Sequence, residues 1–170
     1  MRFINLPELK LLNERFYICE HNKLRHKSSA GGVIVGSEAG TLDKQGYMRF
    51  VLNGKKYNNH RAIYFMRTGE DPMEMEVDHI NGDRLDNSPE NHRLTSRKQN
   101  GRNRALNKNN KLGVKGVYWC KRDLVYKAFI RVDGVKINLG NHNQLESAKS
   151  AYKLAAKKYF GEFVRSEDNE

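Results

Sequence analysis

Four polar residues in the middle of the chain have the types and the spacing needed to cut a phosphodiester bond. Asp78 and His79 are adjacent, and Asn91 and Asn100 follow 12 and 21 positions after the histidine. A histidine can remove a proton from water near neutral pH, and carboxylate and amide oxygens are preferred ligands of hard divalent cations. We therefore predict that His79 is a general base whose ring Asn91 orients through a hydrogen bond. Asp78 and Asn100 are the predicted ligands of Mg²⁺ or Mn²⁺.

Two short strands and a helix are expected to position these groups. The sequence predicts strands at 75–79 and 93–95, a turn-rich polar loop at 81–89, and a helix from 97 to about 106. Neighbouring strand residues point to opposite faces, so Asp78 and His79 can share a site only if the first strand ends or kinks beside them. Asn81 and Gly82 favour a turn and supply that break. Ser96 and Gln99 form a capping box for the helix, and Gly101 weakens it by about 1 kcal/mol.

The whole run resembles a known nuclease family. Asp-His-Ile-Asn-Gly-Asp at 78–83, Asp-Asn at 86–87, Glu-Asn-His-Arg at 90–93 and then Asn100 are similar to the His-Asn-His (HNH) endonucleases, which have a ββα-metal (His-Me finger) fold. The likeness is to the phage-type variant in which the third histidine is an asparagine, and it spans roughly residues 10–105.

The resemblance assigns roles that agree with the chemistry of the residues. It implies a His79 base, an orienting Asn91, ligation of a divalent metal by Asp78 and Asn100, and products with 5′-phosphates. His92 is a departure, because the family usually has an apolar residue there. Asn103, one helical turn after Asn100, is a rival second ligand, and a ββα scaffold without catalytic activity remains an alternative.

A predicted hairpin and a predicted helix precede this motif. Asn53-Gly54 between β-forming residues predicts a hairpin over 46–57, and residues 60–66 are expected to be helical. His60 is interpreted as a packing or loop-bridging histidine. In the region 1–27 only a short helix at 8–12 and a strand at 15–19 can be suggested.

A second unit is expected over residues 112–164. Strands are predicted at 114–119, 125–132 and 135–139, followed by a helix from Leu145 that Gly161 ends. This stretch is similar to the plant ethylene-response-factor (Apetala-two) domain, in which a three-stranded antiparallel sheet packs on one helix and enters the major groove. The expected fold is therefore α+β. Its expected parts are a nuclease domain at 1–104 with an N-terminal hairpin extension, a basic linker at 105–111, the sheet domain at 112–164 and an acidic tail at 165–170.

Basic and aromatic residues of this second unit are the expected DNA contacts. The resemblance and the residue types point to Lys115, Tyr118, Trp119, Lys121, Arg122, Lys127, Arg131 and Lys136. Backbone contacts near the cut are expected from Arg97, Lys98, Arg102 and Arg104. Trp119 is equally compatible with stacking on the nucleic acid and with a place in the core.

The charge distribution agrees with a polyanionic partner. The 170 residues carry a formal net charge of +11 and the sequence pI is about 9.7. Residues 70–90 hold eight acids and one base, whereas 91–122 hold ten Lys or Arg and no acid, as a cation site beside a phosphate-binding surface would. The two distant cysteines provide neither a disulfide framework nor a thiolate zinc site. Without an apolar export signal, a cytoplasmic location is expected.

The sequence thus predicts a metal-dependent endonuclease that acts on double-stranded DNA, as a monomer or weak dimer, with no membrane and no small-molecule cofactor. A non-catalytic, sequence-specific DNA-binding protein is the first alternative, and a basic RNA- or ribosome-associated protein is the second. The sequence does not decide between nicking and double-strand cleavage. It also does not decide between a role in homing, in packaging or in degradation of host DNA.

Overall fold

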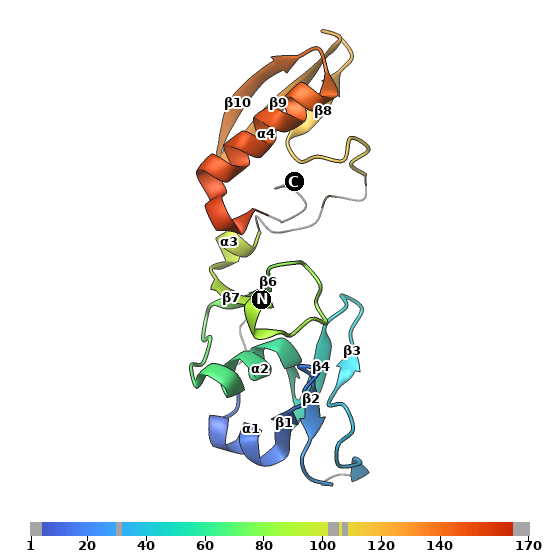
Figure 1. Ribbon diagram of the computed structural model, residues 1–170, viewed down its shortest axis with the longest axis vertical. Coiled ribbons are helices and arrows are strands. Elements are labelled where there is room, and N and C mark those ends of the chain that lie inside the picture. The colour runs from blue at the N-terminus through green and yellow to red at the C-terminus, as the bar shows by residue number, and fades with distance from the viewer. Residues whose placement is uncertain (1–4, 30–31, 102–105, 107–108, 165–170) are drawn as a thin grey trace. The chain divides into compact units, whose positions relative to one another are not determined.

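Short strands joined by tight turns give an α+β protein built from small antiparallel sheets (Figure 1). The computed structural model describes residues 5–29, 32–101, 106 and 109–164. The predicted contacts of Arg102 and Arg104, the rival ligand Asn103 and the acidic tail at 165–170 lie outside these residues. Contacts along the chain divide it into two compact units, Met1–Lys98 and Gln99–Glu170.

The first unit begins with a helix, a two-stranded sheet and a three-stranded sheet. The elements are α1 (Leu9–Arg15), β1 (Phe16–Ile18), β2 (Leu24–His26), β3 (Thr41–Leu42), β4 (Met48–Leu52) and β5 (Lys55–Asn58). The hairpin of β4 and β5 forms as predicted, because Asn53 and Gly54 adopt φ angles of 50° and 74°, which a type I′ turn requires. The sequence did not predict β2 or β3.

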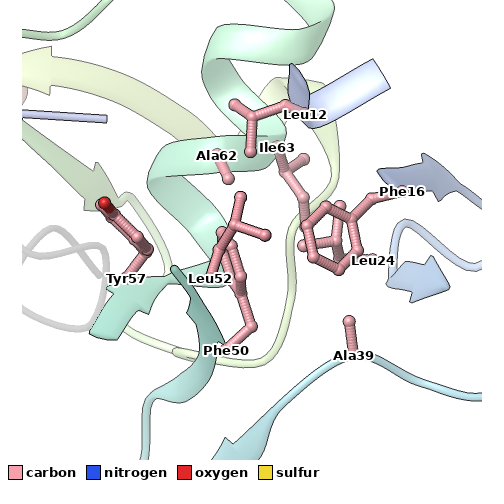
Figure 2. Packing of buried hydrophobic residues seen from close by; sticks show 9 residues of the cluster. All are labelled: Leu12, Phe16, Leu24, Ala39, Phe50, Leu52, Tyr57, Ala62 and Ile63. Atoms are coloured by element: carbon pink, nitrogen blue, oxygen red, sulfur yellow. The ribbon is translucent and has the colours of Figure 1, made fainter. Parts of the chain in front are cut away.

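One apolar core holds these elements against helix α2 (Asn59–Thr68). Phe50, Leu12, Leu24 and Ile63 are at most 2% exposed, and Figure 2 shows them converging between the helices and the strands. Burying a side chain of this size contributes about 1.5–3 kcal/mol. Helix α2 ends at Gly69, whose φ of 74° is the left-handed conformation of a C-terminal cap.

The predicted site lies on an antiparallel pair that follows α2. Strand β6 (Glu76–His79) pairs with β7 (His92–Thr95), and the one-turn helix η2 (Pro89–Asn91) precedes β7. Helix α3 (Arg97–Asn100) comes next and gives way to a turn at Gly101. The helix predicted to reach about residue 106 is therefore shorter, in agreement with the cost of a helical glycine.

The second unit is a three-stranded antiparallel sheet with one long helix packed on it (Figure 1). Its strands are β8 (Val117–Cys120), β9 (Val125–Val132) and β10 (Val135–His142), in the order β10-β9-β8, and the helix is α4 (Leu145–Phe160). Strand β10 runs three residues further than predicted, through an irregularity between Asn138 and Gly140. The one-turn helix η3 (Gly161–Phe163) follows α4. In the described part of the chain, no helix is long and apolar enough to span a bilayer.

Candidate active site

The pairing of β6 with β7 sets the surroundings of the predicted base. His79 lies opposite His92, and Asp78 lies opposite Arg93. Both predicted site residues are buried, with 4% of His79 and 7% of Asp78 exposed. Strand β6 ends at His79, and the amide of Gly82 donates to the His79 carbonyl at 2.9 Å. The strand therefore breaks where the sequence predicted.

His79 is enclosed by other rings. The ring centroids of His60 and His92 each lie 5.0 Å from that of His79, and the Tyr47 ring is 6.3 Å away. Burial lowers the pKa of His79 below its ordinary 6.5, against smaller opposing effects from Asn87 and the nearby acids. The imidazole is therefore neutral at neutral pH, the state in which it can accept a proton.

The sequence predicted a hydrogen bond from Asn91 to the His79 ring, but the side chain of Asn91 instead bonds to the backbone of the neighbouring loop. Its Oδ1 accepts a bond from the Asn81 amide at 2.9 Å, and its Nδ2 donates to the Asp86 carbonyl at 2.8 Å. The residue is the last of η2, so its side chain reaches the backbone of the loop that follows β6. Its side-chain bonds therefore hold the loop that follows His79.

The contact with the His79 ring comes from Asn87, which the sequence presented as a turn residue. The Asn87 Oδ1 lies 3.5 Å from Nε2 of His79, while its Nδ2 donates to the Leu85 carbonyl at 3.3 Å. Asn87 is 5% exposed. Its place next to a histidine eight positions earlier depends on the path of the loop, which residue types alone do not give.

Side-chain bonds within the loop fix that path. Asn81 accepts from the Asp83 amide at 2.7 Å and donates to Oδ2 of Asp86 at 2.8 Å. The Asp86 Oδ1 in turn accepts from the Ser88 hydroxyl at 2.7 Å. These bonds lower the pKa of Asp86. A loop held in this way presents the histidine in a preorganised geometry.

Asp78 has a cationic partner that the sequence analysis missed. Arg93 donates to Oδ2 of Asp78 from Nε at 3.1 Å and from Nη2 at 2.9 Å. Both side chains are largely buried. The two strands were predicted from the sequence, but the register that places residues 78 and 93 opposite each other is seen only in the structure.

The donors around Asp78 suit a hard cation better than a soft one. Among the described residues, no group of three or more His, Cys, Asp or Glu is placed to hold a metal ion. What the site offers is a buried carboxylate, and carboxylates have two oxygens, so one group can serve both an arginine and a metal. Mg²⁺ is commonly held by one or two carboxylates while it keeps water and substrate phosphate as ligands. The Asp78 carboxylate is therefore of the type that a hard divalent cation takes as a ligand. Asn100, the other predicted ligand, is the last residue of α3 and belongs to the second unit.

The predicted DNA contacts of the second unit divide between the two faces of its sheet. Val117, Ala128 and Ile130 are buried beneath α4. The alternation of strand residues places the following side chains on the open face: Tyr118, Lys127, Phe129, Arg131 and Lys136.

Aromatic rings and cations lie together on this open face. The Lys136 Nζ is 4.2 Å from the Phe129 ring centroid and 5.9 Å from that of Tyr118. Arg131 and Lys136 are cross-strand partners.

The other predicted contacts are placed differently. Trp119 is on the helix-covered side, 4.7 Å from the Tyr126 ring and 39% exposed. Lys127 and Arg122 both form ion pairs with Asp123, at 2.5 and 2.7 Å. Lys115 and Lys121 are in turns, and Arg97 and Lys98 are exposed on α3.

The stretch of chain that holds these residues is similar to known proteins. The model of the HNH endonuclease family matches residues 57–102. An uncharacterised HNH endonuclease of Acanthamoeba polyphaga mimivirus is 34% identical over 132 residues, which cover 77% of this chain and 67% of that protein. Protein 3.8 of Escherichia phage T7 is 27% identical over 111 residues, or 65% of this chain and 91% of that protein. No solved structure matches.

Proposed function

Because this chain belongs to the HNH endonuclease family and is therefore a DNA-cleaving enzyme, we propose that it hydrolyses duplex DNA with His79 as general base and one divalent cation, Mg²⁺ or Mn²⁺. The observation that carries the proposal is the state of His79. The ring is buried at the end of a strand, its pKa is lowered by that burial, and Asp78 is its neighbour.

The contact with Asn87 supports one tautomer of His79. An amide oxygen can only accept, so Asn87 Oδ1 favours the tautomer with its proton on Nε2. The Nδ1 atom is then the one that takes a proton from the attacking water. Asn91 keeps this geometry by tying together the two sides of the loop.

Asp78 and Asn100 are the residues that would hold the cation, with Arg93 fixing the Asp78 carboxylate. When bound, the cation neutralises charge on the phosphate and on the departing 3′ oxygen. One such site cuts one strand at a time, so a monomer should nick, leaving 5′-phosphate ends.

The second unit is proposed to hold the enzyme on its substrate. Tyr118, Arg131 and Lys136 lie on the open face of the sheet, and a sheet of this size fits the major groove. The Apetala-two-like pattern of the sequence supports the same use of this face. The exposed cations Arg97 and Lys98 on α3 would add contacts to phosphates.

Nicking of a supercoiled plasmid tests the catalytic proposal. The wild-type protein should nick in the presence of Mg²⁺, and His79→Ala should lower the rate by about 10²–10⁴, because this is the typical contribution of a general base. DNA binding should be retained. His21→Ala is the matched control, because His21 is an exposed histidine in a turn. Nicking by His79→Ala at the wild-type rate would exclude His79 as the base.

A further inference from the structure

We propose that Arg84 binds a backbone phosphate of the DNA next to the cleaved bond, supported by the ring of Tyr47. This inference rests on the proposed function, since it adds a substrate contact to the same site. Neither the chemistry of the site nor the comparisons assign a role to either residue.

Arg84 is tied to the surroundings of the predicted base by two contacts. Its Nη1 donates to the Gln45 carbonyl, and its guanidinium carbon lies 4.8 Å from the centroid of the Tyr47 ring. The Tyr47 ring is in turn 5.2 Å from His60 and 6.3 Å from His79. The Arg84 guanidinium is therefore held against the Tyr47 ring, which is also near the predicted base His79.

The way Arg84 is held differs from that of the other arginines near the site. Arg93 is paired with Asp78, and Arg49 with Asp43. Arg61 donates to two backbone carbonyls and is 8% exposed. Arg84, in contrast, is exposed, and its described contacts are one carbonyl and one ring face, with no carboxylate. An arginine has five N–H donors, so most donors of the Arg84 guanidinium remain available to a phosphate.

Arg84 is the basic residue of an otherwise acidic segment. It is the single base among eight acids in residues 70–90, a segment that DNA must approach for His79 to reach it. The neighbouring carboxylates accept hydrogen bonds from groups of their own loop. Asp83 accepts one from the Leu85 amide, and Asp86 accepts them from Ser88 and Asn81. Arg84 is therefore the side chain of this loop that can attract a phosphate. Stacking on Tyr47 limits its rotamers, so less entropy is lost on binding.

Salt dependence of DNA binding tests the proposal without requiring cleavage. We would measure the affinity of the full chain, carrying His79→Ala, for a linear plasmid-derived duplex at several salt concentrations. Adding Arg84→Gln should lower the slope of log K against log salt by about 0.9, the value for one lost phosphate contact. Arg84→Lys should keep the slope, because it keeps the charge.

Lys10→Gln is the matched control. Lys10 is exposed on α1, which packs on α2, and its replacement removes the same charge from the same unit. Its slope should equal that of the parent protein. An Arg84→Gln slope equal to that of the parent would overturn the proposal, and so would a fall of the same size in Lys10→Gln.

Nicking kinetics of single variants give a second readout. Loss of a contact made equally in the bound and transition states raises KM with kcat unchanged. We expect KM to rise about tenfold in Arg84→Gln, as for loss of a charge-assisted hydrogen bond. A fall in kcat at constant KM and constant salt slope would show a purely structural role for Arg84. Failure of the proposed function would be seen separately, as wild-type nicking that does not depend on His79.

Discussion

At the scale of single residues, the unusual feature is the gathering of three imidazoles around one reactive position. His60 is 6% exposed, and its ring lies 5.0 Å from that of His79. His92 is at the same distance on the other strand. Burial lowers the pKa of all three, to about 4 for His92. At His60 and His92, repulsion from the charge of a protonated His79 lowers the pKa further. The cluster is therefore neutral at neutral pH, and burying it costs far less than burying an ion would.

These lowered pKa values predict a loss of stability in acid. Below about pH 6.5 the unfolded chain binds a proton at His92, whereas the folded protein does so only near pH 4. The unfolded state therefore binds more protons in this window, and the free energy of unfolding falls as the pH falls from 6.5 to 4. His60 acts in the same direction. Above pH 6.5 neither histidine contributes a pH dependence.

His92→Leu should weaken this acid sensitivity, measured by urea unfolding at pH 8, 6 and 5. At pH 8 the variant should be as stable as the wild type or more stable by about 1 kcal/mol, because the buried Nε2 of His92 has no hydrogen-bond partner among the described residues. His21→Leu, at an exposed position, should leave the pH dependence unchanged. A His92→Leu profile that parallels the wild type would show that this ring is not the source.

Residue types and spacing are enough to single out Asp78 and His79, because a base beside a carboxylate followed by a turn is a chemical pattern. They do not give the partners of these residues. Whether the Asn91 amide reaches the ring or the loop depends on side-chain rotamers within a 3-10 turn. Tyr47 and His60 precede the motif by many residues, and only the packing of α2 and the hairpin brings them to His79.

At the scale of elements, turn chemistry was the most informative local signal. Asn53-Gly54 closes the predicted hairpin, and Asp133-Gly134 joins β9 to β10. All four residues have positive φ angles. Strand β3 escaped prediction because it has only two residues, both exposed, and so shows no apolar alternation. Its pairing with β4 is a tertiary contact.

The junction of β8 with α4 depends on a glycine for a reason that its sequence does not reveal. A Cβ at Gly116 would lie 2.1 Å from the Phe129 carbonyl oxygen and 2.6 Å from the Tyr152 ring. The same residue accepts a backbone bond from Phe129 at 2.8 Å. The sheet and the helix therefore pack tightly at Gly116. Moving the Phe129 carbonyl or the buried Tyr152 ring away would cost stability.

Gly116→Ala should therefore destabilise the second unit by about 3 kcal/mol or more, since overpacking adds to the strain of a left-handed backbone. Trp119, the single tryptophan, reports on this unit by fluorescence during urea unfolding. Gly113→Ala is the control, because its φ of 71° nearly equals the 67° of Gly116 and no atom of the described residues would lie within 4 Å of an added Cβ. It should cost only about 1–2 kcal/mol. Equal losses in the two variants would contradict the close contact.

At the scale of the whole molecule, the two units divide charge unequally. Residues 1–98 contain sixteen Lys or Arg and thirteen Asp or Glu, whereas residues 99–170 contain fifteen and seven. Each unit has an apolar core of its own. We infer that the first unit supplies the base His79 and the ligand Asp78, with Arg84 as a local contact, and that most of the electrostatic attraction to DNA comes from the second unit.

The position of the cations, and not only their number, should determine this attraction. Arg131 and Lys136 are partners on the open face of the sheet, whereas Lys153 and Lys157 are one turn apart on α4, which covers the opposite face. Arg131→Gln with Lys136→Gln should lower the salt slope of duplex binding by about 1.8, for two lost phosphate contacts. Lys153→Gln with Lys157→Gln removes the same charge and should leave the slope nearly unchanged. Equal effects of the two pairs would mean that the unit attracts DNA through its net charge alone, without a defined binding face.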